Sequence, residues 1–270
     1  MNPIHSSRRR FVLGAAALPA LMLGSRAALA DELADIRAAK KLRVAVPMGV
    51  PLFAFMDAGM QPTGSDVETG RLIAKALGVE MELVQITNAA RVPIIQTRKA
   101  DILVGNLAIT PERAKVVDFT VPYATLDIIV AGTKSIAVKD YADLKGKRIG
   151  VTRATVNDTM VTQQAPGAEI MRFEDDATLL TAVASGQLDL VSTQTAVLAS
   201  MNEKRGGQPL EVKFVQQSLN LGIALPKGET ALKAWLDDWI RKGFADGTLP
   251  ALFAKFHHRE LPKDLPSHTA

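Results

Sequence analysis

Short runs of aliphatic and β-branched residues alternate with segments of helical periodicity along most of this chain. We expect strands at residues 42–46, 81–86 and 102–104, separated by helices at 66–77 and 89–97. This alternation is typical of α/β folds with a mostly parallel sheet, because each helix returns the chain to the start of the next strand. The sequence therefore predicts an α/β fold.

A similar order of elements recurs in the second half of the chain. Residues 147–151 (KRIGV) resemble residues 42–46 (LRVAV), and residues 188–191 (LDLV) align with residues 100–103 (ADIL). The other elements expected in this half are a helix from about 155, a strand at 169–173 and a helix at 177–185. The pattern predicts two lobes of the same construction.

Two extended segments, residues 128–130 and 222–225, lie between these units, and we expect them to be hinge strands. Lobe one is then formed by residues 31–131 plus 223–270, and lobe two by residues 132–222. Two α/β lobes joined by two strands enclose a cleft between them. Ligands of open parallel sheets bind beyond the carboxyl ends of the strands, so the cleft is the expected ligand site.

Two side-chain amides follow the aligned strands of the two halves. Asn106 lies just past the first of these strands and Gln194 just past the second. Equivalent positions in two facing lobes are predicted to lie on opposite sides of the cleft. The alternative is that both are amides of surface loops.

The first 30 residues have the composition of an export signal. Residues 8–10 (RRR) precede a short apolar run at residues 11–23, and residues 28–30 (ALA) form a small-x-small cleavage site. The apolar run is shorter than the roughly 20 residues needed to cross a bilayer. The arginines resemble the twin-arginine variant of such signals, the alternatives being an ordinary export signal or an uncleaved anchor. We expect a mature chain that begins at Asp31 and works in the periplasm.

Composition excludes several classes of function. The chain has no cysteine, and its four histidines are His5, His257, His258 and His268, so a cysteine nucleophile, a central Ser-His triad or a histidine metal site is not expected. The formal net charge is +4, but four arginines lie in the first 30 residues, which leaves 28 basic against 28 acidic residues. We therefore expect no nucleic-acid partner, no metal and no cofactor.

Arg113 is the strongest candidate for an anion contact. Thr110 and Pro111 have the residue types of a helix N-cap and first helical position, which places Arg113 in the first helical turn. A guanidinium there is suited to clamp a carboxylate or a phosphate. The alternative is a surface arginine paired with Asp118 or Glu112.

These residues belong to a longer motif. Residues 107–115 (LAITPERAK), followed by residues 118–119 (DF) and 122–123 (PY), resemble the signature of periplasmic amino-acid-binding proteins of ABC importers, solute-binding protein family 3. Further landmarks that match in the same order are residues 64–68, 143–147 and 245–249. The resemblance covers residues 31–260. It implies a two-lobed periplasmic-binding-protein fold with two hinge strands, and a monomer that captures a ligand between its lobes and delivers it to a membrane permease.

Carried over position by position, the resemblance implies a ligand site. Arg113 would bind the ligand carboxylate, with Asn106 and Ala108 beside it. Thr155 matches a threonine of lobe two that also reaches this carboxylate. Phe53 falls in the segment whose aromatic residues pack on the apolar part of the ligand.

Arg91 is a second candidate. Residues 88–93 (NAARVP) resemble the Asn-Arg-x-Pro segment of the glutamate/aspartate branch, whose arginine helps to hold an acidic ligand, although Ala90 replaces the asparagine. A second buried guanidinium favours a dicarboxylate or a similarly anionic ligand. The alternative is an arginine on a helix face that bridges to Glu80 or Glu82.

Gln194 departs from the family pattern, because it aligns with an aspartate that accepts the ammonium group of the ligand. A neutral amide cannot neutralise a desolvated cation, and leaving that charge unpaired costs about 3–5 kcal/mol. Either another acid takes over, or the ligand is not an ordinary α-amino acid.

The sequence thus predicts a periplasmic solute-binding protein, not an enzyme, that captures a small polar carboxylate-bearing ligand for an ABC importer. An amino acid is the expected ligand. One alternative is a binding protein for an organic acid without an amine. Another is an enzyme on the same fold that resembles cyclohexadienyl dehydratase, which would need a carboxylic acid in the cleft.

Overall fold

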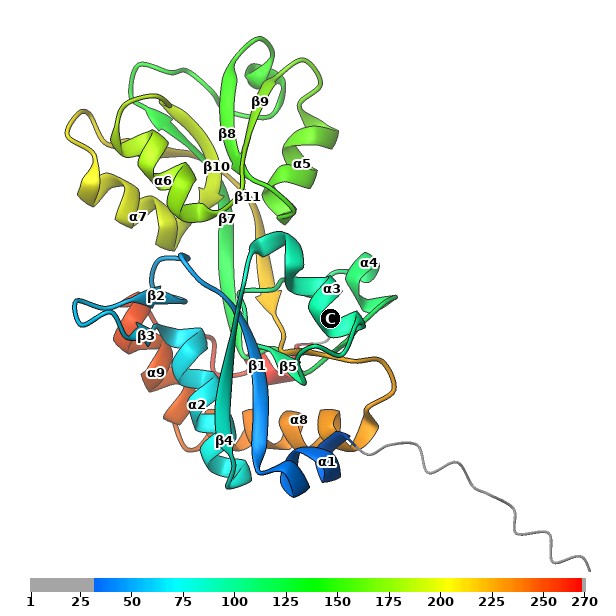
Figure 1. The fold of residues 1–270 in the computed structure, drawn as a ribbon. Helices are drawn as coiled ribbons and strands as arrows, with labels where there is room; N and C mark the ends of the chain where they lie inside the picture. Colours follow the sequence, from blue (N-terminus) through cyan, green and yellow to red (C-terminus); the bar gives the residue numbers. More distant parts are fainter. Residues whose placement is uncertain (1–31, 269–270) are drawn as a thin grey trace, which may run out of the picture. The chain divides into compact units, whose positions relative to one another are not determined.

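The computed structural model describes residues 32–268, which are built on two five-stranded sheets and a small hairpin (Figure 1). The first sheet has the order β4-β1-β5-β12-β6. Its strands are β1 (Lys41–Pro47), β4 (Glu80–Ile86), β5 (Ile102–Leu103), β6 (Asp118–Phe119) and β12 (Ala224–Leu225). β1 is parallel to β4 and β5, whereas β12 is antiparallel to β5 and β6. The predicted parallel pairing is confirmed on one side of this sheet, and the other side is antiparallel.

The second sheet has the order β11-β7-β10-β8-β9. Its strands are β7 (Ala124–Thr133), β8 (Arg148–Thr152), β9 (Glu169–Phe173), β10 (Leu190–Gln194) and β11 (Leu210–Leu221). β8 is parallel to β9 and β10, and β7 is antiparallel to β10 and β11. Figure 1 shows the long pair β7–β11 running from the second sheet toward the elements around the first.

The second connecting strand differs from the prediction. The sequence predicts an extended crossover at residues 222–225, but Ala224 and Leu225 form β12 inside the first sheet, and the strand that pairs with β7 is β11. Residues 222–225 and β11 both contain apolar residues. A short apolar run does not by itself show whether a strand lies inside a sheet or connects two sheets. The first predicted crossover, residues 128–130, lies within β7.

The four helices that the sequence predicts are confirmed within a few residues, at 65–77, 91–96, 156–164 and 176–184. The larger helices are α1 (Glu32–Ala39), α2 (Ser65–Leu77), α5 (Val156–Gln164), α6 (Asp176–Ala184), α7 (Thr195–Lys204), α8 (Thr230–Ala245) and α9 (Thr248–His257). The smaller elements are β2 (Phe55–Met56), β3 (Pro62–Thr63), α3 (Arg91–Gln96), α4 (Pro111–Ala114) and the 3-10 turns η1 (Asn88–Ala90), η2 (Ala142–Leu144) and η3 (Leu265–Ser267). Gly78 ends α2 in the left-handed conformation with φ 72°, a common helix C-cap.

The first sheet is buried on both faces in its middle, and β1 shows why residues 44–46 are a continuous apolar run. Val44 packs in one core cluster with Ile73 of α2, whereas the next residue, Ala45, packs in a second cluster with Ile95 of α3. Successive side chains of a strand point to opposite faces, so a sheet covered on both sides requires apolar residues at every position. The sequence pattern of β1 follows from this double burial.

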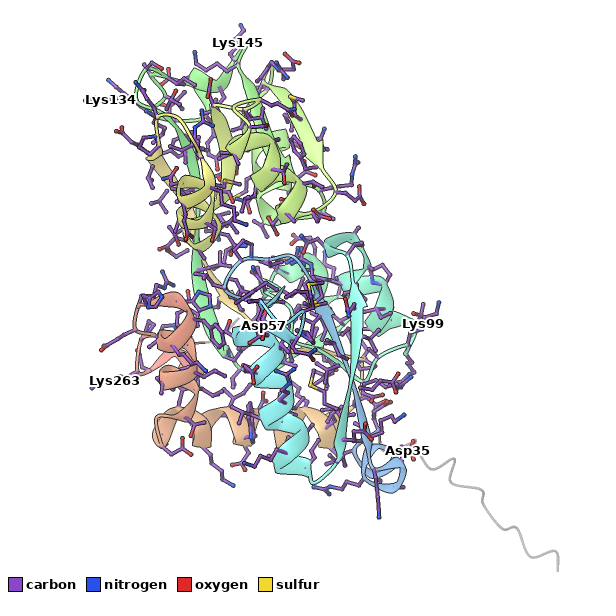
Figure 2. The ribbon with its side chains drawn as sticks, turned by 60° about the vertical axis from the view of Figure 1, so that its left-hand side comes forward. Asp35, Asp57, Lys99, Lys134, Lys145 and Lys263 are labelled. Carbon is purple, nitrogen blue, oxygen red and sulfur yellow. The ribbon has the colours of Figure 1, made fainter. Side chains whose placement is uncertain are left out.

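Charged side chains lie mostly on the outside. Figure 2 shows Lys99, Lys134, Lys145 and Lys263 pointing away from the ribbon. Among the helices of residues 32–268, none has the length and apolar character that crossing a membrane requires. The expected export signal at residues 1–30 lies outside the described residues.

Candidate functional site

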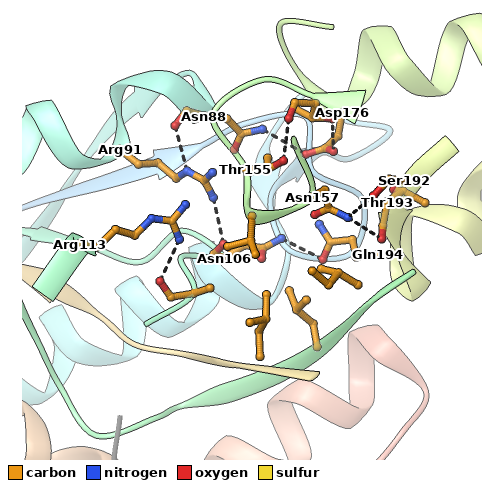
Figure 3. A pocket seen from close by; sticks show the side chains of 16 residues that line it. Asn88, Arg91, Asn106, Arg113, Thr155, Asn157, Asp176, Ser192, Thr193 and Gln194 are labelled. Carbon is orange, nitrogen blue, oxygen red and sulfur yellow. Dashed lines mark hydrogen bonds between the residues drawn. The ribbon is translucent and has the colours of Figure 1, made fainter. Parts of the chain in front are cut away.

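A pocket of about 40 Å³ lies between elements of the two sheets (Figure 3). Residues that follow β4 and β5 line one side, and residues at the ends of β8 and β10 and the start of α6 line the other. Leu126 and Ile128 of β7 and Leu219 of β11 add an apolar wall. The carboxyl ends of the parallel strands therefore meet at this pocket, which is where α/β sheets bind ligands.

Arg113 lines the pocket from α4. The predicted N-cap is confirmed, because the Thr110 side chain accepts a hydrogen bond from the backbone N–H of Arg113 at 3.3 Å. However, α4 has only four residues, so its aligned peptide dipoles are too few to form an anion site. Any anion binding by this segment depends on the guanidinium itself.

The Arg113 guanidinium has few protein partners. Its Nη1 donates to the carbonyl of Ala108 at 2.9 Å, and no carboxylate of residues 32–268 lies within 4.0 Å of its nitrogens. Asp118 pairs with Lys227 instead, so the structure does not contain the surface ion pair considered from the sequence. Burial lowers the pKa of Arg113 to about 10, which leaves the group charged at neutral pH.

Arg91 lines the same pocket and is more fully engaged. Its Nε donates to the Asn88 carbonyl at 3.0 Å, its Nη1 to the Asn106 carbonyl at 3.0 Å, and its Nη2 to the Ala154 carbonyl at 3.2 Å. Burial lowers the pKa of Arg91 to about 9, and the positive charge of Arg113 acts in the same direction. The two guanidinium groups therefore place two positive charges at one end of the pocket.

The alternative role for Arg91 is not observed. Glu82 pairs with Lys41 at 3.1 Å, and Glu80 forms no ion pair with Arg91 within the described part of the chain. Arg91 is 5% exposed and is not an arginine of an open helix face.

Asn106 and Gln194 meet across the pocket. The Asn106 Nδ2 donates to the Gln194 Oε1 at 3.1 Å, and both residues are buried. Asn106 has φ 49°, in the left-handed region that asparagine tolerates better than most residues. The two side chains therefore face the pocket from opposite sheets, as their aligned positions predict, and are not surface amides.

Ala108 and Thr155 also line the pocket. The Ala108 carbonyl is occupied by Arg113, and Ala108 bridges to Leu221 at the end of β11. The Thr155 hydroxyl donates to the Thr152 carbonyl at 2.7 Å and accepts from the Asp158 backbone N–H at 3.2 Å, which caps α5. The structure thus brings six of the seven candidate site residues to one pocket.

Phe53 is the seventh, and the structure places it elsewhere. It does not line this pocket; its ring packs edge-on against His257, with ring centroids 4.4 Å apart, and it is 1% exposed. The expectation that Phe53 packs on a ligand in this pocket is therefore not met by its position. An aromatic residue in an apolar segment satisfies the same sequence pattern when it is part of the core.

Asp176 is a pocket residue that the sequence analysis missed. It is the first residue of α6, it is 6% exposed, and it is the one acidic residue among those that line the pocket. Its Oδ1 accepts from the Thr152 hydroxyl at 2.8 Å and its Oδ2 from the Asn88 amide at 3.2 Å. Burial raises the pKa of Asp176, while these two hydrogen bonds and the charge of Arg91 oppose that shift.

Asp176 and its partners share one position in the fold, the carboxyl end of a parallel strand, and this position could have identified them from the predicted strands. Asn88 follows β4, Thr152 ends β8 and Asp176 follows β9, so all three lie at carboxyl ends of parallel strands. Among the strand ends at the pocket, the sequence prediction included only the two that precede Asn106 and Gln194. Asn157 also lines the pocket, and it donates to the Thr193 carbonyl at 2.9 Å.

The pocket lining combines charged groups with neutral polar groups. Two guanidinium groups, one carboxylate and several neutral amides and hydroxyls surround it. Within residues 32–268, no group of three or more His, Asp or Glu side chains is arranged to hold a metal ion. The arrangement can bind a carboxylate at Arg113 and can accept hydrogen bonds at Asp176.

Several proteins of known name are similar to this chain. The glutamine-binding protein GlnH of an ABC transporter of Bacillus subtilis (strain 168) is 28% identical over 84% of each chain. The L-cystine-binding protein TcyJ of Escherichia coli (strain K12) is 26% identical over 94% of this chain and 97% of its own length. The ABC transporter arginine-binding protein 1 of the same organism is 29% identical over 78% of this chain and 88% of its own.

Solved structures that are similar to this chain also include amino-acid-binding proteins. A mutant of the arginine-binding protein ArgBP from T. maritima has a TM-score of 0.78 at 28% identity, over 84% of this chain and all of its own. The ancestral amino-acid-binding protein AncCDT-1, described as a precursor of cyclohexadienyl dehydratase, has a TM-score of 0.77 at 32% identity, over 83% of this chain and 99% of its own. The chain therefore has the two-lobed α/β fold of periplasmic binding proteins.

The family match covers most of the chain. Residues 42–259 match the family described as bacterial extracellular solute-binding proteins, family 3. With this match, and with a pocket between its two sheets, the chain belongs to the family 3 solute-binding proteins of bacteria.

Proposed function

We propose that this protein captures an α-amino acid with an acidic side chain and delivers it to an ABC importer. The observation that carries this proposal is the pair of guanidinium groups in the pocket, that of Arg91, which is buried, and that of Arg113, which is half-buried. A buried charge is costly unless it is paired, so two cations at one end of a pocket favour an anionic ligand.

Charge balance favours the acidic class of amino acid. Two guanidinium groups and the Asp176 carboxylate give the pocket lining a formal charge of +1. A ligand with two carboxylates and one ammonium, such as glutamate or aspartate, carries −1 and balances it. The relatives whose names specify glutamine, cystine or arginine bind ligands without this net charge at neutral pH, and we propose that this chain differs from them.

The proposal assigns a role to each of six residues. Arg113 binds the α-carboxylate, with Thr155, Asn106 and Ala108 around it, and Arg91 favours the second carboxylate. Arg113 is suited to the first role because its Nη2 and Nε make no hydrogen bond with the described residues. Gln194 closes the pocket through its bond to Asn106.

Ligand entry requires motion, which we propose occurs by hinge closure between lobe one (residues 31–131 plus 223–270) and lobe two (residues 132–222). The pocket volume of about 40 Å³ is room for roughly one to three water molecules, so an amino acid enters only when the lining groups move apart. Strands β7 and β11 are the hinge in this proposal. Binding then shifts the population toward a closed form that a permease recognises.

We also propose that residues 1–30 export the protein to the periplasm by the twin-arginine route and are cleaved there. The test replaces residues 8–10 by lysine, which keeps the positive charge. Accumulation of uncleaved protein in the cytoplasm supports this route, and unchanged export means that an ordinary signal is used.

The ligand class is tested by a thermal-shift screen of the purified protein with L-amino acids, their 2-oxo analogues and simple dicarboxylates. A ligand at 100 times its Kd adds about 2.7 kcal/mol to the free energy of unfolding, which raises Tm measurably. The largest shift is expected with glutamate or aspartate. A shift only with compounds that lack the amine would contradict the amino-acid class.

A second candidate function is a dehydratase that acts on cyclohexadienyl acids. It is favoured by one observation, the buried carboxyl group of Asp176, whose pKa is raised and which could serve as an acid. The similarity to AncCDT-1 is in line with it. Incubation with prephenate or arogenate distinguishes the two, because only an enzyme releases phenylpyruvate or phenylalanine faster than the spontaneous reaction.

A further inference from the structure

We propose that Asp176, and not residue 194, supplies the negative charge that binds the ammonium group of the ligand. The inference rests on the proposed function, because it requires an α-amino acid. It addresses the one position at which the site lacks an expected group: residue 194 is a glutamine, and a neutral amide cannot neutralise a buried cation.

The Asp176 carboxylate is held in place and still has free acceptor capacity. Thr152 donates to its Oδ1 and Asn88 to its Oδ2, so each oxygen accepts one neutral donor. An ionised carboxylate has about four acceptor positions, which leaves about two for further N–H groups. The two hydrogen bonds therefore orient the carboxylate and leave acceptor positions free for a ligand.

Asp176 forms no ion pair with the cations of the pocket, although the charge of Arg91 acts on it. No carboxylate oxygen of Asp176 lies within 4.0 Å of a guanidinium nitrogen of Arg91 or Arg113 in the described structure. Figure 3 shows Arg113 and Asp176 on opposite sides of the pocket, with Arg91 between them. A zwitterion fits this polarity, with its carboxylate toward Arg113 and its ammonium toward Asp176.

Gln194 is also less available than its position suggests. Its side-chain oxygen, the atom that could accept from an ammonium group, already accepts from the Asn106 amide at 3.1 Å. Asp176 therefore offers the negative charge that Gln194 lacks, and about two free acceptor positions against one on the Gln194 oxygen.

The decisive comparison is between amino acids and their 2-oxo acids, which have the same carboxylates but no ammonium. Asp176→Asn keeps the size of the side chain and removes its charge. We expect it to weaken binding of the amino acid by about two to three orders of magnitude, the effect of leaving a buried charge unpaired. Binding of the matching 2-oxo acid is expected to change much less, because that ligand has no cation to neutralise.

A matched control and a rescue sharpen the test. Glu174→Gln removes a carboxylate two residues away that is exposed and pairs with Arg153, so it is expected to leave affinity unchanged. In the Asp176→Asn background, Gln194→Asp restores a carboxylate on the other strand end. This double variant is expected to regain a substantial part of the lost affinity for amino acids and none for 2-oxo acids.

The experiment measures Kd by calorimetry for all four proteins, with a panel of the twenty L-amino acids and the available 2-oxo acids, including L-glutamate with 2-oxoglutarate. If the unmodified protein binds no member, the proposed function has failed. If it binds amino acids and Asp176→Asn binds them equally well, or loses amino acids and 2-oxo acids to the same extent, Asp176 does not hold the ammonium. If the unmodified protein prefers 2-oxo acids, the inference is overturned as well. Circular dichroism melts show whether each variant is folded.

Discussion

The Asn106 amide donates to the Gln194 side-chain oxygen at 3.1 Å, and these two residues are 88 positions apart in the chain. Asn88 and Asp176 are joined in the same way and are also 88 positions apart. The same offset relates β5 to the first two residues of β10. Residues that correspond in the two halves therefore meet each other at the pocket, which is the geometry that two facing units of the same construction produce.

The Asn106–Gln194 bond can be measured directly by a double-mutant cycle. Asn106→Gly and Gln194→Ala, made singly and together, are expected to show a coupling of about 0.5–1.5 kcal/mol in the free energy of unfolding. Urea unfolding followed by circular dichroism gives the four values. Strict additivity would show that the bond does not contribute in solution.

Asn106 also carries a backbone conformation that most residues avoid. Its φ of 49° suits asparagine or glycine, so Asn106→Ala should be less stable than Asn106→Gly by about 1 kcal/mol, although both lose the amide. Equal stability of the two variants would mean that the left-handed conformation is not maintained. Ala199, on α7 and away from this bend, serves for a control pair, because Ala199→Gly should there be the less stable protein.

Much of the fold follows from local sequence. β1, β4 and β9 are apolar or alternating runs bounded by turns, and α2 ends at a glycine. In these elements the hydrophobic period predicts the type of element and the flanking residues predict where it ends. The part that could not be predicted is how strands pair. β11 begins far upstream of the apolar segment at residues 222–225, and its alternation is interrupted by two register shifts against β7.

The candidate site was only partly predictable for a similar reason. Arg113 and Gln194 stand in recognisable motifs or aligned positions, and the structure places both at the pocket. Asp176 follows Asp175, the N-cap of α6, and an acidic residue in the first turn of a helix is favoured by the helix dipole before any ligand is considered. Its hydrogen bond with Asn88 joins segments 88 residues apart, so the pairing of these two residues, unlike their positions after strands, cannot be predicted from a local pattern.

Asp66 is expected to make stability depend on pH. It is fully buried, its Oδ1 accepts from the Tyr123 hydroxyl at 2.7 Å, and burial raises its pKa from 3.8 to about 7. The hydrogen bonds from Tyr123 and the Asn106 backbone and the charge of Arg91 oppose this shift. The folded state then holds the proton more tightly than the unfolded chain, so this contribution to stability is present below pH 3.8 and is lost as pH rises through about 7.

The variant Asp66→Asn isolates that contribution. Between pH 4 and 7 the unmodified protein should lose stability relative to Asp66→Asn, by at most about 1.4 kcal/mol per pH unit. Urea unfolding at several pH values measures the difference. A difference between the two proteins that stays constant over this pH range would contradict the raised pKa of Asp66.

Arg113 gives the most direct test of the site. Arg113→Ala removes a half-buried guanidinium whose one hydrogen bond within residues 32–268 is to the Ala108 carbonyl, so the folded protein loses little while a bound carboxylate loses its main partner. Breaking a buried charge pair by removing one partner costs about 3–5 kcal/mol, so affinity should fall by two orders of magnitude or more. Arg113→Lys keeps the charge but loses the planar fork of the guanidinium. Its affinity should lie between those of the unmodified protein and Arg113→Ala. Arg148→Ala, at an exposed ion pair on β8, is the control. Calorimetry with L-glutamate measures all three, and unchanged affinity in Arg113→Ala would remove Arg113 from the site.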